Sequence, residues 1–357
     1  MKIGIVSAEP SGDLLGSKII SKLKEKFKNI EIVGVGDGPL TEHNVSNNRE
    51  MLEIMGFIDP ILNLQKIINF RNNLVQTFIN QKIDMFIGVD APDFNFDIHK
   101  KLQKEGIKTI HVVCPSVWAW RPGRAKKFKY VDYMLCLFPF ELEYCSNVNK
   151  KAFFIGHPLL DKEPNFKNND KENLICLMPG SRKSEIKNNL EVMIDGFNQF
   201  NCEEKYKAVI PIYKEDDKHY IQHKIQNHKH ITFIKAESSE ILKKAKAAVV
   251  CSGTATLEAL LAEIPTTVIY KTNWFNHLLL KNLIKSEFVS IPNIIADEEI
   301  FLELLQSNAS AENIANDLSS NMADYEFRKK MIQAVKAKLK NTNLDPFIER
   351  LYEDCRS

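Results

Sequence analysis

The sequence lacks the features that mark membrane-spanning, secreted and nucleic-acid-binding proteins. Its seven cysteines are odd in number and form no Cys-x-x-Cys pair, which argues against a disulfide framework and against a zinc site. No apolar run approaches the roughly 20 residues of a membrane-spanning helix, and the N-terminal apolar run is too short for a signal peptide. A net charge of only +2 gives no general attraction for nucleic acid. We therefore expect a cytoplasmic chain with reduced thiols and no nucleic-acid partner.

What the sequence does have is an alternation of short apolar runs and helical patterns. The runs Lys2–Ser7, Met85–Val89 and Thr109–Val113 indicate buried strands, with helical spacing of apolar residues between them. Such alternation is typical of a parallel sheet with crossover helices. The polar stretch Lys162–Asn173 indicates a linker, and the alternation starts again at Leu174–Met178.

The predicted fold class is α/β, with two Rossmann-like domains facing each other across a cleft. We expect an N-terminal domain over residues 1–160 and a second domain over residues 161–330. Residues 331–357 are predicted to form C-terminal helices that can pack back on the first domain. Because ligands of open α/β sheets bind beyond the C-terminal ends of the strands, the loops there carry the candidate sites.

Two loops of the first domain carry carboxylates. Glu9 and Ser11 follow the first strand, and Asp90, Asp93 and Asn95 follow the strand that ends at position 89. A carboxylate at a strand end can act as a general base when partial burial raises its pKa. Taken alone, the first loop favours an ordinary capped helix start, and the second fits an Asx turn as well as a catalytic site.

Two loops of the second domain have the character of phosphate sites. Pro179–Arg182 is a tight turn into a helix, with Glu185 in its first turn, and an arginine can grip two phosphate oxygens at once. Ser252–Thr256 is a small, hydroxyl-rich loop before a helix that contains Glu258. Each loop alone also fits an ordinary helix start. Neither has the Gly-Lys-Ser/Thr ending of a P-loop, so the pair predicts a nucleotide-diphosphate donor rather than ATP hydrolysis.

Two of the three tryptophans lie in one proline-flanked loop beside a run of basic residues. Trp118 and Trp120 suit an interface that is apolar on one side and wet on the other, and Arg121 and Arg124 suit a phosphate or anionic head groups. Alternatively, the tryptophans fill a core and the bases are solvated. The apolar segment Ile58–Ile79 similarly suits either a helix lying in a membrane surface or a core-facing helix.

Eight motifs occur in an order that resembles the lipid-A-disaccharide synthase family of inverting GT-B glycosyltransferases. They are MKIGIVSAEPSGDLLG, GVDAPDFNF, CPSVWAWRPGRAKK, LCLFPFELEYC, GHPLLD, LMPGSRKSEI, CSGTATLEALLAEIPTTVIYK and VSIPN, and they run from about Lys2 to Asn293. The resemblance implies transfer of 2,3-diacylglucosamine from UDP-2,3-diacylglucosamine to 2,3-diacylglucosamine 1-phosphate. The products are the β-1,6-linked lipid A disaccharide and UDP. It further implies peripheral association with the inner membrane of a Gram-negative-type bacterium, no cofactor and no metal, and it allows a homodimer.

The resemblance also implies residue roles. Asp90 matches the candidate base, with Asp93 and Glu9 beside it. The residues expected at the donor are Ser181, Arg182, Glu185, Ser252, Gly253, Thr254, Thr256, Glu258 and Asn293. Those expected at the acceptor or its lipid chains are Ser11, Asn95, Trp118, Trp120, Arg121 and Arg124. One departure is Asp37, which separates two glycines where the family often has Gly-Gly-Pro.

Overall fold

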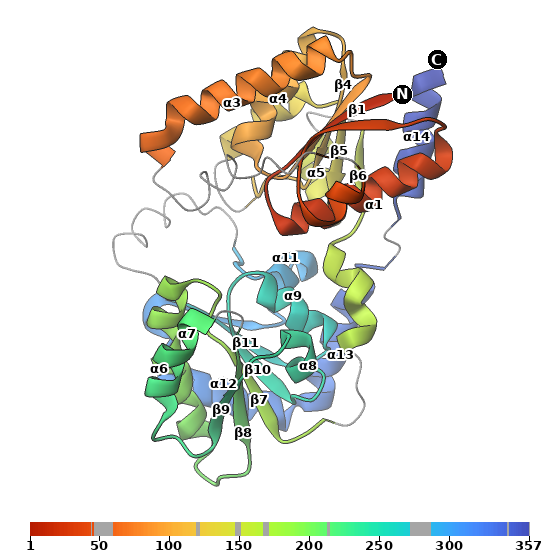
Figure 1. Cartoon of the computed structure of the whole chain (residues 1–357). Helices are drawn as coiled ribbons and strands as arrows, with labels where there is room; N and C mark the ends of the chain where they lie inside the picture. Colours follow the sequence, from red (N-terminus) through yellow and green to blue (C-terminus); the bar gives the residue numbers. More distant parts are fainter. Residues whose placement is uncertain are drawn as a thin grey trace. The chain divides into compact units, whose positions relative to one another are not determined.

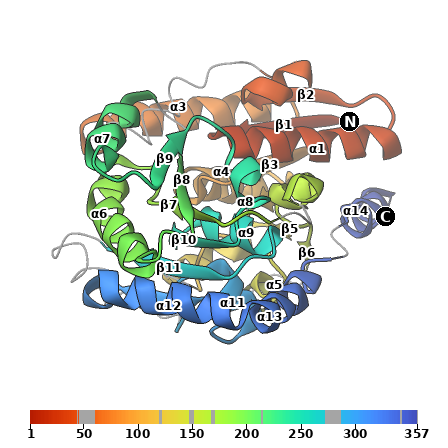
Figure 2. The same cartoon turned by 90° about the horizontal axis from the view of Figure 1, so that it is seen from below.

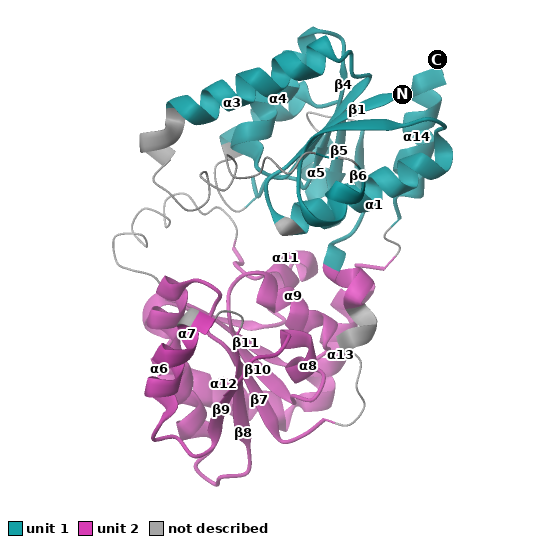
Figure 3. Ribbon diagram, viewed as in Figure 1, with its two compact units in different colours: residues 1–158, 341–357 teal, residues 159–340 magenta. Residues whose placement is uncertain are grey.

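The computed structural model describes the chain in two compact units, coloured separately in Figure 3. The described residues are 1–43, 45, 60–118, 122–146, 151–166, 171–212, 215–271, 287–340 and 343–356. Unit 1 contains Met1–Pro158 and Asn341–Ser357, and unit 2 contains Leu159–Lys340. The C-terminal segment therefore belongs to the same unit as the N-terminus. Residues 331–340, which the sequence grouped with the tail, belong to unit 2.

Unit 1 is built on a six-stranded sheet in which every paired strand is parallel, in the order β2-β1-β3-β4-β5-β6 (Figure 1). Its strands are β1 (Lys2–Ser7), β2 (Glu31–Val35), β3 (Met85–Val89), β4 (Lys108–Val112), β5 (Tyr133–Cys136) and β6 (Ala152–Phe154). Its helices are α1 (Pro10–Lys26), η1 (Gly38–His43), α3 (Pro60–Asn80), α4 (Pro92–Lys104), η2 (Pro122–Tyr130), α5 (Glu141–Ser146) and α14 (Asp345–Arg356). The 3₁₀ helix η3 (Pro158–Phe166) begins at the last residue before unit 2.

Alternate residues of the central strands point to opposite faces of the unit 1 sheet, as the period of a strand requires. Val6 and Phe86 belong to the core cluster that α3 and α4 cover. Ile5 points the other way, and a Cβ at Gly16 of α1 would lie 3.1 Å from its Cδ1 atom. Both faces are thus buried, which explains why these strands are continuous apolar runs.

Unit 2 repeats the plan with a second six-stranded parallel sheet, in the order β12-β11-β10-β7-β8-β9. Its strands are β7 (Leu174–Met178), β8 (Lys207–Pro211), β9 (Ile231–Ile234), β10 (Ala247–Cys251), β11 (Thr266–Tyr270) and β12 (Leu302–Leu305). Its helices are α6 (Lys183–Phe200), α7 (Glu215–Ile225), α8 (Ser238–Leu242), α9 (Thr254–Leu261), α11 (Ile291–Ala296), η4 (Gln306–Asn308), α12 (Ala311–Ala323) and α13 (Tyr325–Ala337).

Helices α6 and α12 pack side by side against the unit 2 sheet, as Figure 2 shows. Their contact is close because Gly196 of α6 faces Ile314 of α12, where an added Cβ would approach the isoleucine side chain to 2.6 Å. Leu190, Phe197 and Leu318 complete this face of the core and are fully buried. This packing fixes the axis of α6, whose first turn borders the site described below.

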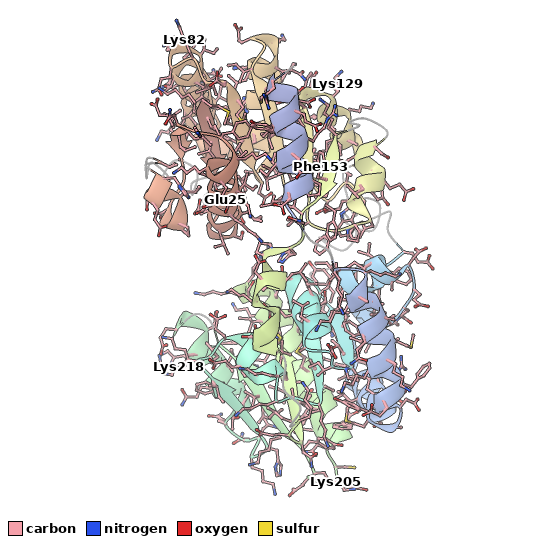
Figure 4. The ribbon with its side chains drawn as sticks, turned by 90° about the vertical axis from the view of Figure 1, so that its right-hand side faces the viewer. Glu25, Lys82, Lys129, Phe153, Lys205 and Lys218 are labelled. Carbon is pink, nitrogen blue, oxygen red and sulfur yellow. The ribbon has the colours of Figure 1, made fainter. Side chains whose placement is uncertain are left out.

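The last helix, α14, packs on the strands of unit 1. Phe347 lies against Tyr133 of β5 and Phe153 of β6, at ring-centroid distances of 5.7 and 5.8 Å. Phe153 is labelled in Figure 4. Asp354 accepts hydrogen bonds from the Tyr133 hydroxyl and from Lys151. The chain therefore returns to its first sheet after completing the second one.

Helix α3 carries part of the apolar segment Ile58–Ile79, for which the sequence left a membrane-surface role open. Within its described side chains, Ile67 is buried in the unit 1 core and the Phe70 ring lies 6.3 Å from that of Phe94. The core-facing alternative is therefore confirmed for these residues. None of the helices in the described ranges is long and apolar enough to cross a membrane.

Candidate functional site

A pocket of about 360 Å³ opens in unit 2 at the C-terminal ends of the strands. It lies where β7 and β10 lead into α6 and α9. The residues that line it are Met178, Pro179, Gly180, Ser181, Arg182, Glu185, Pro211, Cys251, Ser252, Gly253, Thr254, Ala255 and Glu258. The structure thus brings together seven of the nine residues predicted at the donor, all except Thr256 and Asn293.

The first loop of the pocket is shaped by Glu185. Its carboxylate accepts hydrogen bonds from the backbone N–H groups of Ser181 and Arg182, at 3.1 and 3.3 Å, and from the Arg182 side chain at 3.1 Å. Gly180 has a φ of 119°, and a Cβ there would lie 2.5 Å from the Cβ of Glu185. Glu185 therefore holds the turn closed. Arg182 also lines the pocket, and its side chain is 79% exposed.

The second loop leaves the start of α9 open. Gly253 precedes the helix with a φ of 144°, no side chain caps the helix, and a Cβ at Gly253 would meet nothing within 4 Å. The first N–H groups of a helix have no partner within it and carry partial positive charge, so an open helix start binds anions. Because both α6 and α9 begin at this pocket, it suits a diphosphate.

Thr256 does not join the pocket, contrary to expectation. Its side chain is fully buried, and its hydroxyl donates to the carbonyl oxygen of Gly253 at 2.8 Å. The hydroxyl is therefore used to hold the turn at Gly253 and not to contact a ligand. Thr256 therefore stabilises the conformation of the second loop from the buried side of α9.

Glu258 lies one turn into α9 at the wall of the pocket. It is half-buried, and the Ser238 hydroxyl donates a hydrogen bond of 2.5 Å to its carboxylate. Burial raises the pKa of Glu258, and the bond from Ser238 opposes that shift. A fixed carboxylate in this place can accept hydrogen bonds from sugar hydroxyls.

Asn293 was also expected at the donor, but its side chain is buried and fully engaged elsewhere. It donates to the Glu303 carboxylate at 2.8 Å. Glu303 also accepts from the backbone of Val289 at 2.8 Å and of Ser290 at 2.9 Å. The Ser252 hydroxyl in turn donates to the carbonyl of Val289 at 2.9 Å. Asn293 and Glu303 therefore position the segment behind Ser252.

Asn189 lies behind both loops, and no motif in the sequence pointed to it. Its amide donates to the Glu185 carbonyl at 2.8 Å, and its oxygen accepts from the backbone N–H of Lys271 at 3.0 Å. The amide also lies 3.7 Å from the sulfur of Cys251. A buried asparagine thus ties α6 to the ends of β10 and β11 and keeps the two loops in register.

In unit 1, the candidate acceptor residues collect around the ends of β1 and β3. These strands pair with Ser7 opposite Val89, so the loop containing Glu9 lies beside Asp90. Burial raises the pKa of Asp90, and the negative charge of Glu9 raises it further. Asp90 and Ala91 also have positive φ values of 50° and 41°, a strained conformation of the kind that occurs at functional sites.

Asn95 was expected to face the acceptor, and the structure corrects this. Its side chain has no exposed surface, and its amide donates to the carbonyl oxygens of Val89 at 3.3 Å and Asp90 at 2.8 Å. A side chain used in this way cannot contact a substrate. It instead braces the strained turn that carries Asp90.

Asp93 and Arg124 form an ion pair across the same region. The carboxylate of Asp93 is 63% exposed, whereas the guanidinium side chain of Arg124 is 14% exposed. Ser11 is exposed at the start of α1. Arg124 therefore presents its positive charge next to Asp93 and close to the turn of Asp90.

Trp118 is half-buried and packs edge-to-face on Phe140, with 5.3 Å between the ring centroids. Beside it lies Glu141, whose carboxylate accepts from the backbone N–H groups of Leu137 and Phe138 at 2.8 and 3.0 Å. Burial raises the pKa of Glu141 to about 8, although these two bonds lower it. The predicted acceptor residues Trp120 and Arg121 lie outside the described residues.

Comparison with solved structures defines the class of protein. The chain resembles a UDP-GlcNAc 2-epimerase from Neisseria meningitidis bound to UDP-GlcNAc, with a TM-score of 0.65 at 12% identity over 99% of this chain and 100% of that one. It also resembles an alpha,alpha-trehalose-phosphate synthase (UDP-forming) from Burkholderia vietnamiensis, with a TM-score of 0.57 at 11% identity over 100% of both chains. The predicted α/β class with two Rossmann-like domains of GT-B type is confirmed.

Sequence comparison then identifies the family. The family described as lipid-A-disaccharide synthetase matches residues 3–350. The lipid-A-disaccharide synthase of Saccharophagus degradans is 34% identical over 354 residues, covering 94% of this chain and 91% of that protein. The one from Idiomarina loihiensis is 36% identical over 336 residues, covering 89% and 88%. The chain belongs to the lipid-A-disaccharide synthetase family and is a glycosyltransferase of lipid A biosynthesis, as the motifs indicated.

Proposed function

We propose that the chain transfers 2,3-diacylglucosamine from UDP-2,3-diacylglucosamine to 2,3-diacylglucosamine 1-phosphate with inversion at the anomeric carbon. Unit 2 holds the UDP part of the donor in the pocket between the starts of α6 and α9. Unit 1 holds the acceptor near Asp90, which takes the proton from the acceptor's 6-hydroxyl. The observation that carries the proposal is the pocket itself, where an open helix start and an exposed arginine converge.

Departure of UDP requires that negative charge growing on the diphosphate be stabilised. The N–H groups at the start of α9 are fixed in place, so they stabilise that charge without reorganising. Arg182 is exposed at the pocket wall and can turn toward two phosphate oxygens. Glu258 lies about one helical turn into α9 and lines the same pocket, so its carboxylate can accept hydrogen bonds from the ribose hydroxyls of a bound UDP.

Asp90 is a better base than Asp93 for two physical reasons. Burial and the charge of Glu9 raise the pKa of Asp90, which strengthens it as a proton acceptor. Asp93 is instead exposed, and its Oδ2 atom is already engaged by the guanidinium of Arg124. The ion pair with Asp93 holds Arg124 near Asp90. When the acceptor binds, Arg124 can leave Asp93 and bind the acceptor's phosphate.

Both substrates carry fatty acyl chains, so we place the protein at the cytoplasmic face of the inner membrane. Trp118 is half-buried, and the exposed bases Lys126 and Lys129 follow on η2, where Lys129 projects from the surface in Figure 4. Such bases are attracted to anionic lipid head groups. Flotation with anionic vesicles tests this: Lys126→Glu/Lys129→Glu should weaken binding, and unchanged binding would remove η2 from the contact. A homodimer stays a prediction.

The decisive experiment measures UDP binding and turnover separately. Arg182→Ala should weaken UDP binding by roughly 10- to 100-fold, because a hydrogen bond between charged groups is lost. Lys187→Ala, an exposed change further along α6, is the matched control and should leave binding unchanged. Asp90→Asn should bind UDP normally but lose roughly 10²- to 10⁴-fold in turnover.

Two outcomes would contradict the proposal. Unchanged UDP affinity in Arg182→Ala would remove the phosphate role of that residue, and near-normal turnover in Asp90→Asn would remove the base. UDP release from the donor in the absence of the monosaccharide phosphate would show hydrolysis instead of transfer.

A further inference from the structure

Three cysteines that are far apart in the sequence meet in the core of unit 1. Cys114 follows β4, Cys136 ends β5, and Cys145 lies in α5. The sulfur of Cys145 is 3.6 Å from that of Cys114 and 3.8 Å from that of Cys136, and all three sulfurs lie within 4.8 Å of one another. Their spacing along the chain is that of no standard metal motif, which is why the sequence argued against a metal site.

The geometry of the three sulfurs fits one metal ion. Two thiolates bound to the same tetrahedral zinc ion at about 2.3 Å lie about 3.8 Å apart. The two sulfur–sulfur distances at Cys145 have this size already, so binding requires little movement of the core. A disulfide would require one pair to close to about 2 Å and would leave the third cysteine out.

The charges and the apolar surroundings of the cluster favour binding of a cation. Hydrogen bonds from Cys114 and Cys136 lower the pKa of Cys145, because they favour its thiolate. Cys114 is 3% exposed and the other two are fully buried. The buried side chains packed around them are the apolar Phe96, Val117, Phe128, Val131 and Met134. A buried anion in such surroundings is costly unless a cation or strong donors compensate it.

Glu141 adds a second acidic group to this corner of the core. It lies in the same short helix as Cys145, and the negative charge of the cysteine contributes to the raised pKa of Glu141, after the larger effect of burial. The charge of Glu141 in turn raises the pKa of Cys114 and of Cys136, so a cation bound at the sulfurs also offsets the charge of this glutamate. Thiolate ligands select soft ions such as zinc, cadmium or copper(I) over magnesium or calcium.

We propose that Cys114, Cys136 and Cys145 form a binding site for a soft metal ion, with zinc as the expected physiological occupant. Binding displaces the thiol protons of the three cysteines, so the ion exchanges for up to three protons and leaves three thiolates on one centre. The ion joins β4, β5 and α5. It thereby fixes Cys114, four residues before Trp118, and stabilises the origin of the tryptophan loop. The site does not depend on the roles proposed above for Asp90 and Arg182.

Cobalt(II) is the probe for the test, because thiolate ligands give it an intense near-ultraviolet charge-transfer band. The full chain, reduced with a phosphine and freed of metal by a chelator, is titrated with cobalt and then with zinc. We expect the band to saturate at one cobalt per chain and to disappear when zinc displaces cobalt. Zinc should also raise the melting temperature of the metal-free protein.

Variants separate the cluster from the other thiols of the chain. Cys145→Ser should abolish the band and the thermal shift, and Cys136→Ala, an apolar change in an apolar core, should do the same with the fold checked by circular dichroism. The exposed cysteines supply the control: Cys202→Ser/Cys355→Ser should keep both signals. A wild type without the band, a band that survives in Cys145→Ser and Cys136→Ala, or a band lost in the control would each overturn the site.

Discussion

The side-chain amide of Asn95 donates a hydrogen bond of 2.8 Å to the main-chain carbonyl oxygen of Asp90. Asp90 and the following residue, Ala91, both have positive φ values that non-glycine residues rarely adopt. The bond crosses the turn from α4, where the Asn95 side chain is buried. A strained turn persists only when its surroundings fix it, so the position of the proposed base depends on an asparagine that touches no substrate.

Asn95→Ala should therefore lower turnover without affecting the donor. The carbonyls of Val89 and Asp90 lose a donor, and we expect a loss of about 1–3 kcal/mol in unfolding free energy. A shift of the base by a fraction of an ångström or more should cost up to about 100-fold in turnover. UDP affinity, which depends on unit 2, should stay within about twofold in a titration. Asn69→Ala, at an exposed site on α3, is the matched control; turnover equal to wild type in Asn95→Ala would show that the turn does not need the amide.

The charge of Glu9 should be visible in the pH dependence of the reaction. A base works only when it is deprotonated. Because the charge of Glu9 raises the pKa of Asp90, activity on the acid side is lost at a higher pH than it would be without Glu9. In Glu9→Gln the pKa of Asp90 falls, and the acid limb of kcat/KM should move to lower pH. The rate in the plateau should also decrease, because a weaker base accepts the proton less readily.

Glu31→Gln, an exposed change paired with Lys2, is the control for this profile and should leave the limb in place. An acid limb that stays where it was in Glu9→Gln would show that the titrating group is not coupled to Glu9. That result would count against Asp90 as the base.

The alternation of apolar runs was enough to predict both sheets, because strands buried on two faces are apolar at every position. The strands at Lys2–Ser7, Met85–Val89 and Leu174–Met178 have the predicted bounds. The strand β12 was missed, since Leu302–Leu305 is an edge strand with only partial burial and a glutamate within it. The gathering of two loops into one pocket depends on β7 and β10 being neighbours in the sheet, and the sequence did not predict this strand order.

What the sequence could not settle was the direction of individual polar side chains. Asn95, Thr256 and Asn293 all stand in loops or helix starts where a ligand contact is chemically reasonable. In the structure each bonds to the backbone or to a buried carboxylate. A buried backbone group without a hydrogen-bond partner destabilises the fold by about as much free energy as a ligand contact contributes to binding. A polar side chain can therefore serve either purpose, and its residue type alone does not show which. The cysteine cluster was hidden for a related reason, since only the fold brings β4, β5 and α5 together.

Gly253→Ala tests whether the open start of α9 binds phosphate. Alanine at a φ of 144° is strained, and its methyl group would stand at the entrance to the helix N–H groups. We expect about 1–2 kcal/mol less stability and roughly tenfold weaker UDP binding by calorimetry. Gly123→Ala is the control, since that glycine also has open space around its Cβ position but an ordinary φ. Full UDP affinity in Gly253→Ala would place the phosphates elsewhere in the pocket.

Asp354 should make the docking of α14 dependent on pH. Hydrogen bonds from Lys151 and Tyr133 lower the pKa of Asp354 from 3.8 to about 2. A carboxylate whose pKa is lower in the folded state stabilises the fold above its unfolded pKa, and this contribution is lost as the pH falls from about 4 toward 2. Asp354→Asn should therefore reduce the free energy of unfolding by on the order of 1 kcal/mol at pH 7, allowing for screening by solvent.

The difference between Asp354→Asn and wild type should be constant from pH 7 to pH 5 and should shrink in urea titrations below pH 4. Glu353→Gln, an exposed neighbour on α14 at 70% side-chain exposure, should follow wild type at every pH. A deficit in Asp354→Asn that is the same at pH 3.5 as at pH 7 would mean that packing around Tyr133, and not the charge of Asp354, holds the helix on the sheet. Limited proteolysis at pH 7 gives an independent check, because a loosened α14 exposes the bonds near residue 343 to cleavage first.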